Sequence, residues 1–351
     1  MKILHVTGYA VRGGCEKNCL HFIAGSPQYQ HAVIVLGIEG PMSAEWRDAG
    51  ARVDHLDILK ENVIAFGSKL RKFIKGNKYD LVIAWSTIRL SMQLYAFDSA
   101  TRDVRVYLGN PVGKNYRSVK DIVLSKIYRH SCGVELMACS GYVSRSYVAS
   151  SYYSRYPIHI SLNPVPVPST KPVIAPDSSV LQAGMVARLD RIKDHATVLR
   201  AFAEVGNQDI KYHLHIVGNG EQMTMLTGLA DSLKITNSVT FHGDVKDVYN
   251  YLRSWHIFTY ATTPEEGLGS AVAEAMSNGL PCILSDLPML RELAPGAEAV
   301  WFEAGNAQDL AEKVIALWKD PASRRQLSDK AYAHAERAFA VQRFINDYID
   351  A

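Results

Sequence analysis

Two glutamates frame a glycine-rich turn in the second half of the chain, and their setting suggests ligand binding. Residues 263–276 read TPEEGLGSAVAEAM, in which Glu266 precedes a predicted short helix and Glu274 lies within it. Gly267 and Gly269 allow the backbone at the start of that helix to approach a ligand closely. A helix start presents N–H groups and the positive end of the helix dipole, which suits a phosphate or diphosphate. The alternative is a capped core helix that carries surface acids.

The spacing of the two glutamates indicates which chemistry they could share. Eight residues of continuous helix span about 12 Å at 1.5 Å per residue. The paired acids of glycoside hydrolases lie roughly 5–9.5 Å apart, close enough to flank one bond. We therefore expect Glu266 and Glu274 to bind separate parts of a ligand rather than to act as one acid/base pair.

Two cations follow the first predicted strand of the second half. Arg188 and Lys193 lie in the segment GMVARLDRIK, which spans residues 184–193. A guanidinium fork can bind a diphosphate through two hydrogen bonds, and an ammonium adds a point charge. Solvated loop charges are the ordinary alternative, but a position at the carboxyl end of a strand favours ligand binding.

Glycine turns follow other predicted strands. Gly14 lies in the letters GGCE after the first strand, Gly218 in HIVGNGE and Gly243 in FHGD. Such turns admit a phosphate or a nucleotide base close to backbone N–H groups. Each of them taken alone is more typical of a tight turn that needs glycine for its backbone angles.

The order of these motifs resembles that of the family 4 retaining glycosyltransferases, which have the GT-B fold. The chain contains, in order, Gly-Gly-x-Glu, Arg-x4-Lys, Gly-x-Gly-Glu, His-Gly-Asp, and Glu-x7-Glu followed by Gly-Leu-Pro. The resemblance covers essentially the whole chain, and the block from Glu266 to Pro281 is its most specific part.

The resemblance implies a donor site for a nucleoside-diphosphate sugar. Catalytic roles would fall to Arg188 and Lys193, which would hold the diphosphate, and to Glu266, which would contact hydroxyls of the transferred sugar. The donor-binding residues would be Gly14, Gly218, Gly243, Leu268, Gly269, Ser270 and Glu274, the last of them on the ribose. No metal or other cofactor is expected, because Arg, Lys and a helix N-terminus can offset the charge of the leaving diphosphate.

One position departs from the family pattern. Many relatives have a histidine near the end of the fourth or fifth strand of the first domain, facing the reacting sugar, whereas Asn110 stands at the nearest equivalent place here. Asn can donate or accept a hydrogen bond but cannot act as an acid or base at neutral pH. Two other functions stay open, and Asn110 motivates the first of them. They are a catalytically impaired nucleotide- or glycan-binding protein of the GT-B fold, and a UDP-sugar epimerase.

Length and alternation predict an α/β protein with two domains. A chain of 351 residues exceeds one ordinary core, and 48% hydrophobic with 21% charged residues is typical of a globular protein. Strand-like apolar runs alternate with helical patterns in both halves, as in parallel sheets covered by helices. With the resemblance, this predicts two Rossmann-like, doubly wound domains facing across a cleft, and a C-terminal helix that returns to the first domain.

A proline-rich run sets the predicted domain boundary. Residues 163–172 read NPVPVPSTKP, which excludes helix and favours a semi-rigid linker, although a long surface loop within one domain is the alternative. We assign residues 1–165 to an N-terminal acceptor domain and 166–334 to a C-terminal nucleotide-sugar donor domain. Residues from about 335 to 351 are expected to join the first domain through the aromatic side chains of Phe339, Phe344 and Tyr348.

The periodicity of apolar residues predicts the individual elements. Strands are expected at 3–7, 32–36, 53–56, 81–85, 104–108, 136–139, 159–162, 180–186, 213–217, 238–241, 257–260, 282–285 and 299–302. Helices are expected at 16–24, 63–75, 119–130, 196–205, 221–233, 248–253, 308–318 and 322–348, together with the short helix after Glu266.

Charge is divided unevenly between the two halves. Residues 1–165 contain 21 Lys and Arg against 12 Asp and Glu, a balance of +9, and the remainder contains 17 against 23, a balance of −6. In residues 114–130 basic and apolar positions interleave in a helical pattern, which suits an anionic membrane surface but is also that of an ordinary helix with a solvated face. Nucleic acid is not an expected partner, because no basic groove with interleaved aromatic residues can be traced.

The expected location follows from the absence of targeting signals. No apolar run approaches the roughly 18 residues that a membrane span needs, and a strand pattern begins directly after Met1 without the pattern of a signal peptide. These features predict a cytoplasmic protein, with peripheral association at the inner face of the cell membrane as an additional hypothesis. The five cysteines are odd in number and lack zinc-site spacing, so we expect reduced thiols.

Overall fold

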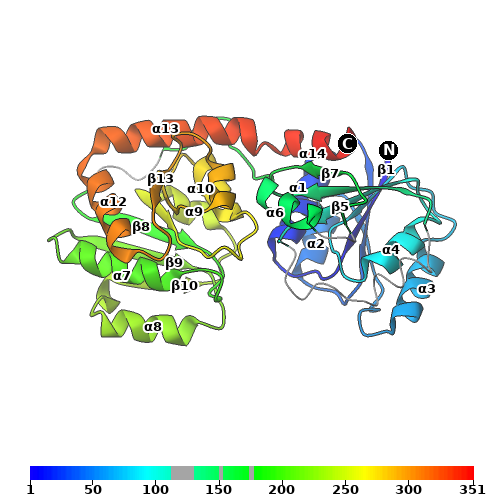
Figure 1. The fold of residues 1–351 in the computed structure, drawn as a ribbon, viewed down its shortest axis with the longest axis horizontal. Coiled ribbons are helices and arrows are strands. Elements are labelled where there is room, and N and C mark those ends of the chain that lie inside the picture. Colours follow the sequence, from blue (N-terminus) through cyan, green and yellow to red (C-terminus); the bar gives the residue numbers. More distant parts are fainter. Residues whose placement is uncertain (112–129, 150–152, 174–177) are drawn as a thin grey trace. The chain divides into compact units, whose positions relative to one another are not determined.

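The computed structural model describes the chain except for residues 112–129, 150–152 and 174–177. It divides into two compact units, each built on a parallel sheet with helices (Figure 1). Within the described residues, no helix combines the length and the apolarity needed to span a membrane. The helix predicted at 119–130 lies outside the described residues, together with most of the predicted basic face.

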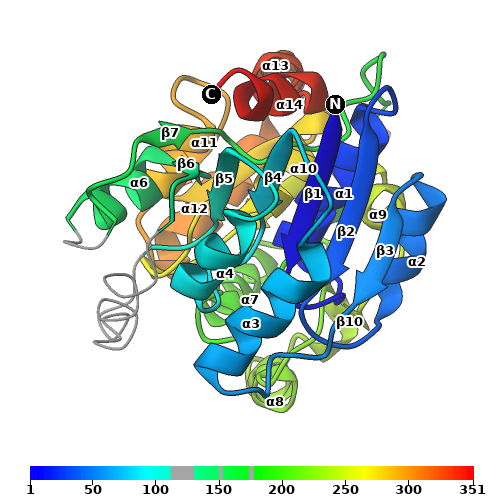
Figure 2. The ribbon, with the colours of Figure 1, turned by 90° about the vertical axis from the view of Figure 1, so that its right-hand side faces the viewer.

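The first unit consists of Met1–Pro164 and Val341–Ala351. Its described strands form one parallel sheet in the order β3-β2-β1-β4-β5-β6-β7, and the first five lie side by side in Figure 2. The order reverses between β1 and β4, and the carboxyl ends of these two strands are therefore the topological switch point of a doubly wound sheet. The strands are β1 Lys2–Thr7, β2 Gln30–Val35, β3 Arg52–His55, β4 Leu81–Ala84, β5 Asp103–Leu108, β6 Gly133–Ala138 and β7 Ile158–Ile160.

The helices of the first unit connect these parallel strands. They are α1 Gly14–Gly25, α2 Pro41–Asp48, α3 Val63–Ile74, α4 Leu90–Phe97, α6 Gly141–Val148 and α14 Val341–Ile349. Burial on both faces explains why β4 is a continuous apolar run, Leu-Val-Ile-Ala, with all of its residues buried.

The second unit, Val165–Ala340, repeats this architecture. Its described strands form a parallel sheet in the order β10-β9-β8-β11-β12-β13, with the switch point between β8 and β11. The strands are β8 Leu181–Val186, β9 Tyr212–Val217, β10 Val239–Gly243, β11 Ile257–Tyr260, β12 Cys282–Ser285 and β13 Val300–Phe302. The helices are α7 His195–Gly206, α8 Met223–Ser232, α9 Val248–Arg253, α10 Ser270–Ser277, α11 Pro288–Leu293, α12 Ala307–Lys319 and α13 Pro321–Ala338, with a 3-10 turn at Thr236–Ser238.

The C-terminal helix packs on the first unit, as the sequence predicts. Phe344 and Tyr348 are fully buried, and their rings lie 6.4 Å and 6.0 Å from that of Phe22 in α1. The single helix expected at 322–348 is wrong, however, because the chain leaves helical geometry at Phe339, which has φ −118°. Phe339 packs edge-on against His334 and its carbonyl accepts the N–H of Val165, so this aromatic side chain stays with the second unit.

The predicted strands are all present, with ends shifted by no more than three residues. Four helices, α2, α4, α6 and α11, were missed because they are short and lack a long apolar period. Local signals for three of them were present. Pro41 and Pro288 occupy the first turn of their helices, and the Ser140 side chain accepts the N–H of Val143.

Candidate functional site

Two loops meet at the switch point of the second sheet. One follows β8 and carries Arg188 and Lys193, and the other follows β11 and carries Glu266. An antiparallel bridge between Lys193 and Thr262 joins them, and the Thr262 hydroxyl donates to the carbonyl of Ile192 at 2.9 Å. The topology thus brings the predicted catalytic residues to one place. Ligands of doubly wound sheets bind there, beyond the carboxyl ends of the strands at this reversal.

Lys193, Tyr260 and Glu266 form a buried cluster of polar side chains. The Lys193 ammonium pairs with Glu266 Oε2, and the two side chains are only 11% and 10% exposed. Lys193 Nζ also lies 3.0 Å from the Tyr260 hydroxyl oxygen, which lies 2.9 Å from Glu266 Oε2. Glu266 Oε1 accepts the N–H of Gly267 at 2.9 Å. Both carboxylate oxygens are therefore hydrogen-bonded, as a buried charge requires.

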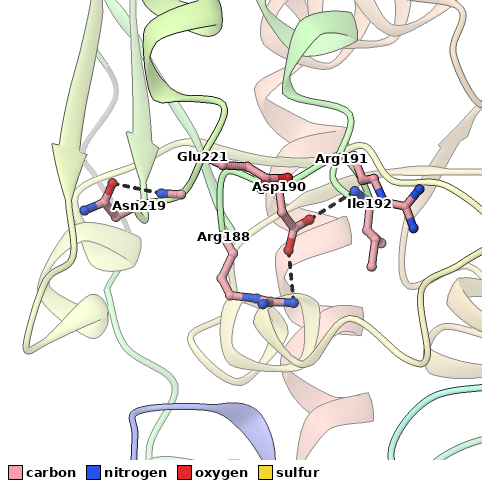
Figure 3. A pocket seen from close by; sticks show the side chains of 7 residues that line it. Arg188, Asp190, Arg191, Ile192, Asn219 and Glu221 are labelled. Carbon is pink, nitrogen blue, oxygen red and sulfur yellow. Dashed lines mark hydrogen bonds and ion pairs between the residues drawn. The ribbon is translucent and has the colours of Figure 1, made fainter.

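Arg188 lies in a more open part of the same region. Figure 3 shows its guanidinium directed at the Asp190 carboxylate, with 3.0 Å between Nη2 and Oδ2. The other Asp190 oxygen accepts the N–H of Ile192 at 3.0 Å, which fixes the carboxylate. The Arg188 side chain is 76% exposed, so its remaining donors are accessible to an anion. The pocket here has a volume of about 390 Å³ and is lined by Arg188, Asp190, Arg191, Ile192, Asn219, Gly220 and Glu221.

The predicted glycines of the second unit have structural reasons to be glycine. Gly218 and Gly243, at the ends of β9 and β10, form a bridge in which the Gly218 N–H donates to the Gly243 carbonyl at 2.9 Å. Gly218 has φ +133°, and a Cβ there would lie 2.0 Å from the carbonyl oxygen of Ala187. Gly269 has φ +84° and caps the N-terminus of α10. These positions therefore hold turns at the sheet edge, whatever further role they have.

The loop before α10 brings the other predicted donor-binding residues to that edge. Leu268 is 2% exposed, and Ser270 is the first residue of the helix. Glu274 lies in the middle of α10 and is 7% exposed. Burial, and to a lesser extent the Glu274 carboxylate, raises the pKa of Tyr249 in α9, which places the two side chains near one another. Because the helix starts only at Ser270, Glu266 and Glu274 do not lie on one continuous helix, and the premise of the 12 Å estimate is wrong.

The remaining predicted residues belong to the first unit. Gly14 is exposed as the first residue of α1, and a Cβ at this position would meet no atom within 4 Å. Asn110 is exposed in a bend just after β5. Both lie beyond the carboxyl ends of strands, where ligands of such sheets bind. The structure therefore places two of the predicted residues in one unit and the others in the second.

Sequence reasoning missed Asp190 and Tyr260. Asp190 stands between the two predicted cations, and a carboxylate at that spacing was a usable signal for a partner of Arg188. Tyr260 gave no signal, since an aromatic residue inside an apolar strand is ordinarily core. Only the adjacency of β8 and β11 shows that its hydroxyl reaches the ion pair.

His195, the first residue of α7, makes a pH-dependent contribution to stability. It is fully buried, and burial lowers its pKa to about 4. In the unfolded chain the imidazole takes up a proton near pH 6.5, whereas in the folded protein it stays neutral down to about pH 4. The folding stability that depends on the neutral ring is therefore complete above pH 6.5 and is lost as the pH falls toward 4. Between pH 7 and 4.5, urea unfolding of the parent should lose about 1–3 kcal/mol more than that of a His195→Gln variant. Equal losses would exclude His195 as the titrating group.

Comparison with known proteins identifies a family match in the second unit. Residues 169–334 match the model of the family described as "Glycosyl transferases group 1". This range contains the switch-point loops, the pocket and the predicted residues from Arg188 to Glu274.

Relatives by sequence extend over more of the chain. The putative glycosyltransferase EpsF of Bacillus subtilis is 24% identical over 306 residues, covering 81% of this chain and 79% of EpsF. The lipopolysaccharide core biosynthesis glycosyltransferase LpsD of Rhizobium meliloti is 26% identical over 193 residues, covering 53% of each chain. The family match and these relatives support a glycosyltransferase.

Solved structures match the whole chain. HepE of Anabaena, in complex with UDP and glucose, has a TM-score of 0.82 at 16% identity and covers 100% of this chain and 98% of its own. A glycosyltransferase from Rickettsia africae has a TM-score of 0.78 at 14% identity, with 99% and 97% coverage. At these identities the likeness concerns the fold, and it confirms the predicted GT-B class of two Rossmann-like domains.

Proposed function

We propose that this protein is a retaining glycosyltransferase of the family 4 type. It would move a sugar from a nucleoside-diphosphate sugar to a hydroxyl of a glycan or lipid-linked acceptor, in the synthesis of a bacterial surface polysaccharide or glycoconjugate. The observation that carries the proposal is the convergence of Arg188, Lys193 and Glu266 on the switch point of the second sheet, inside the family match. The names of EpsF and LpsD support the polysaccharide context.

The charges at the site suit this chemistry. In the proposed reaction the acceptor oxygen bonds to the anomeric carbon while the bond from that carbon to the donor phosphate oxygen breaks. The leaving diphosphate gains negative charge and takes up the proton of the acceptor hydroxyl. Arg188, Lys193 and the N-terminus of α10 would stabilise that charge without a divalent metal. Glu266 would hold hydroxyls of the transferred sugar, Glu274 those of the ribose, and the backbone of residues 268–270 the phosphates.

Uridine nucleotides are the first donors to test. The HepE structures contain UDP with glucose or UDP-glucose, and the pneumococcal O-GlcNAc transferase GtfA is described in complex with UDP and GlcNAc. No side chain in this sequence identifies the base, so GDP- and ADP-sugars belong in the same panel. Gly218 and Gly243, at the ends of neighbouring strands, would lie beside the nucleotide.

The test combines binding with turnover. Nucleoside diphosphates and their sugars are screened for a rise in melting temperature, since a ligand of the folded state stabilises it by mass action. The stabilising sugar nucleotide is then incubated with and without acceptor glycans, in EDTA, and the anomeric configuration of the product is read by NMR. Transfer with retained configuration supports the proposal. Binding without transfer or hydrolysis would favour a binding protein, and isomerised donor without acceptor would favour an epimerase.

We propose that the first half of the chain binds the acceptor. The balance of +9 in residues 1–165 suits an acceptor presented at an anionic membrane surface, and we propose that this half associates with it peripherally. The purified protein should sediment with anionic vesicles at low salt and be released by salt, because the Debye length shortens from about 30 Å at 0.01 M to about 3 Å at 1 M. Sedimentation that is equally weak with anionic and neutral vesicles would contradict this association.

A further inference from the structure

The hydroxyl of Tyr260 joins the two charged residues of the proposed donor site. Tyr260 is the last residue of β11 and is 2% exposed. An ammonium has no lone pair, so the hydrogen bond with Lys193 at 3.0 Å must be donated by Lys193 to the phenolic oxygen. The single hydrogen of the Tyr260 hydroxyl is then available for Glu266 Oε2 at 2.9 Å. The direction of both bonds follows from the chemistry of the three groups.

The ring of Tyr260 is held in place from two sides. It stacks with Phe258, two residues earlier on the same strand, at a centroid distance of 6.1 Å and an interplanar angle of 16°. Its other neighbour is the turn before α10, where a Cβ at Gly269 would lie 3.1 Å from Tyr260 Cε1. The hydroxyl is therefore carried by a fixed ring rather than by a mobile side chain.

We propose that Tyr260 is a positioning residue that keeps the Glu266 carboxylate oriented when Lys193 engages a diphosphate. This inference rests on the proposed function. A phosphate that draws the Lys193 ammonium away would leave a buried carboxylate short of a partner, which is costly. The Tyr260 hydroxyl and the Gly267 N–H then supply one donor to each oxygen of Glu266. Glu266 can thus face the sugar without following Lys193.

The Tyr260→Phe variant tests this assignment, because it removes the hydroxyl and keeps the ring. We expect transfer kcat to fall roughly tenfold or more, the effect of losing a hydrogen bond to a charged group. The KM for the donor and the binding of UDP alone should stay within about twofold, since the hydroxyl does not touch the phosphates in this assignment. The matched control is Tyr212→Phe, because Tyr212 on β9 also has a buried ring. The activity of this variant should match that of the parent.

Two results with substrate would overturn the inference: an unchanged kcat in Tyr260→Phe, or a loss of UDP binding as large as the loss of transfer. A double-mutant cycle with Glu266→Gln needs no substrate and separates this question from the proposed function. The shift in urea midpoint caused by Tyr260→Phe should be less than half as large in the Glu266→Gln background. Additive shifts would contradict the coupling between hydroxyl and carboxylate. A parent that neither transfers nor hydrolyses any sugar nucleotide would instead overturn the proposed function.

Discussion

Replacing Arg188 with alanine is expected to lower sugar transfer by about 10²–10³-fold, the effect of removing one preorganised donor to a developing negative charge. The Asp190 carboxylate orients the guanidinium, and most of the side chain is exposed toward the pocket. Steady-state kinetics with a fixed acceptor and varied donor measure the effect. We expect the fall mainly in kcat, because the leaving diphosphate carries more charge in the transition state than in the bound donor.

Arg191→Ala is the matched control for this prediction. Arg191 lines the same pocket and is 75% exposed, but it pairs with the exposed Glu265 at 3.4 Å. An exposed ion pair of this kind contributes little to stability. Arg191 has no assigned role on the diphosphate, so we expect the kcat of Arg191→Ala to stay within about threefold of the parent. The comparison removes the general effect of taking one positive charge from the pocket. Near-normal turnover of Arg188→Ala, or equal losses in both variants, would contradict the diphosphate role of Arg188.

The fold could be predicted because its determinants are local and repetitive. Apolar runs such as Leu81–Ala84 require burial on both faces, and this requirement together with helical periodicity already specifies a parallel α/β sheet. The end of the long C-terminal helix could not be read in the same way. Ala338 and Val341 continue a helical pattern, and the break depends on the burial of Phe339 against His334. Tertiary packing overrode local propensity there.

The candidate site was predictable where charge and glycine mark it, and not where a core residue supplies it. Arg188, Lys193 and Glu266 stood out as polar residues at strand ends. The pairing of Lys193 with Glu266 depends on which strands are neighbours, and the strand order in the sheet is a long-range property. Gly218 illustrates the same limit. Its sequence context suggested a wall for a nucleotide base or a tight turn, and the carbonyl oxygen of Ala187, just after the neighbouring strand β8, is what excludes a side chain there.

The Lys193→Ala variant is expected to lose stability as well as activity. Removing the ammonium leaves the buried Glu266 carboxylate without its paired cation. Breaking a buried ion pair in this way typically costs about 3–5 kcal/mol of folding stability. The second unit should therefore unfold at a clearly lower urea concentration than in the parent. Lys171→Ala is the matched control, because Lys171 pairs with an Asp329 side chain that is 72% exposed. Its loss should stay below about 1 kcal/mol.

A second variant separates the charge from the packing. In Lys193→Met the aliphatic stem is largely kept, so a loss close to that of Lys193→Ala assigns the effect to the unpaired carboxylate. Neutralising that carboxylate in Lys193→Met with Glu266→Gln should recover more than half of the lost stability while transfer stays abolished. Such a result would show that the pair is retained for its chemistry rather than for the fold. A Lys193→Ala variant as stable as Lys171→Ala would contradict the burial argument.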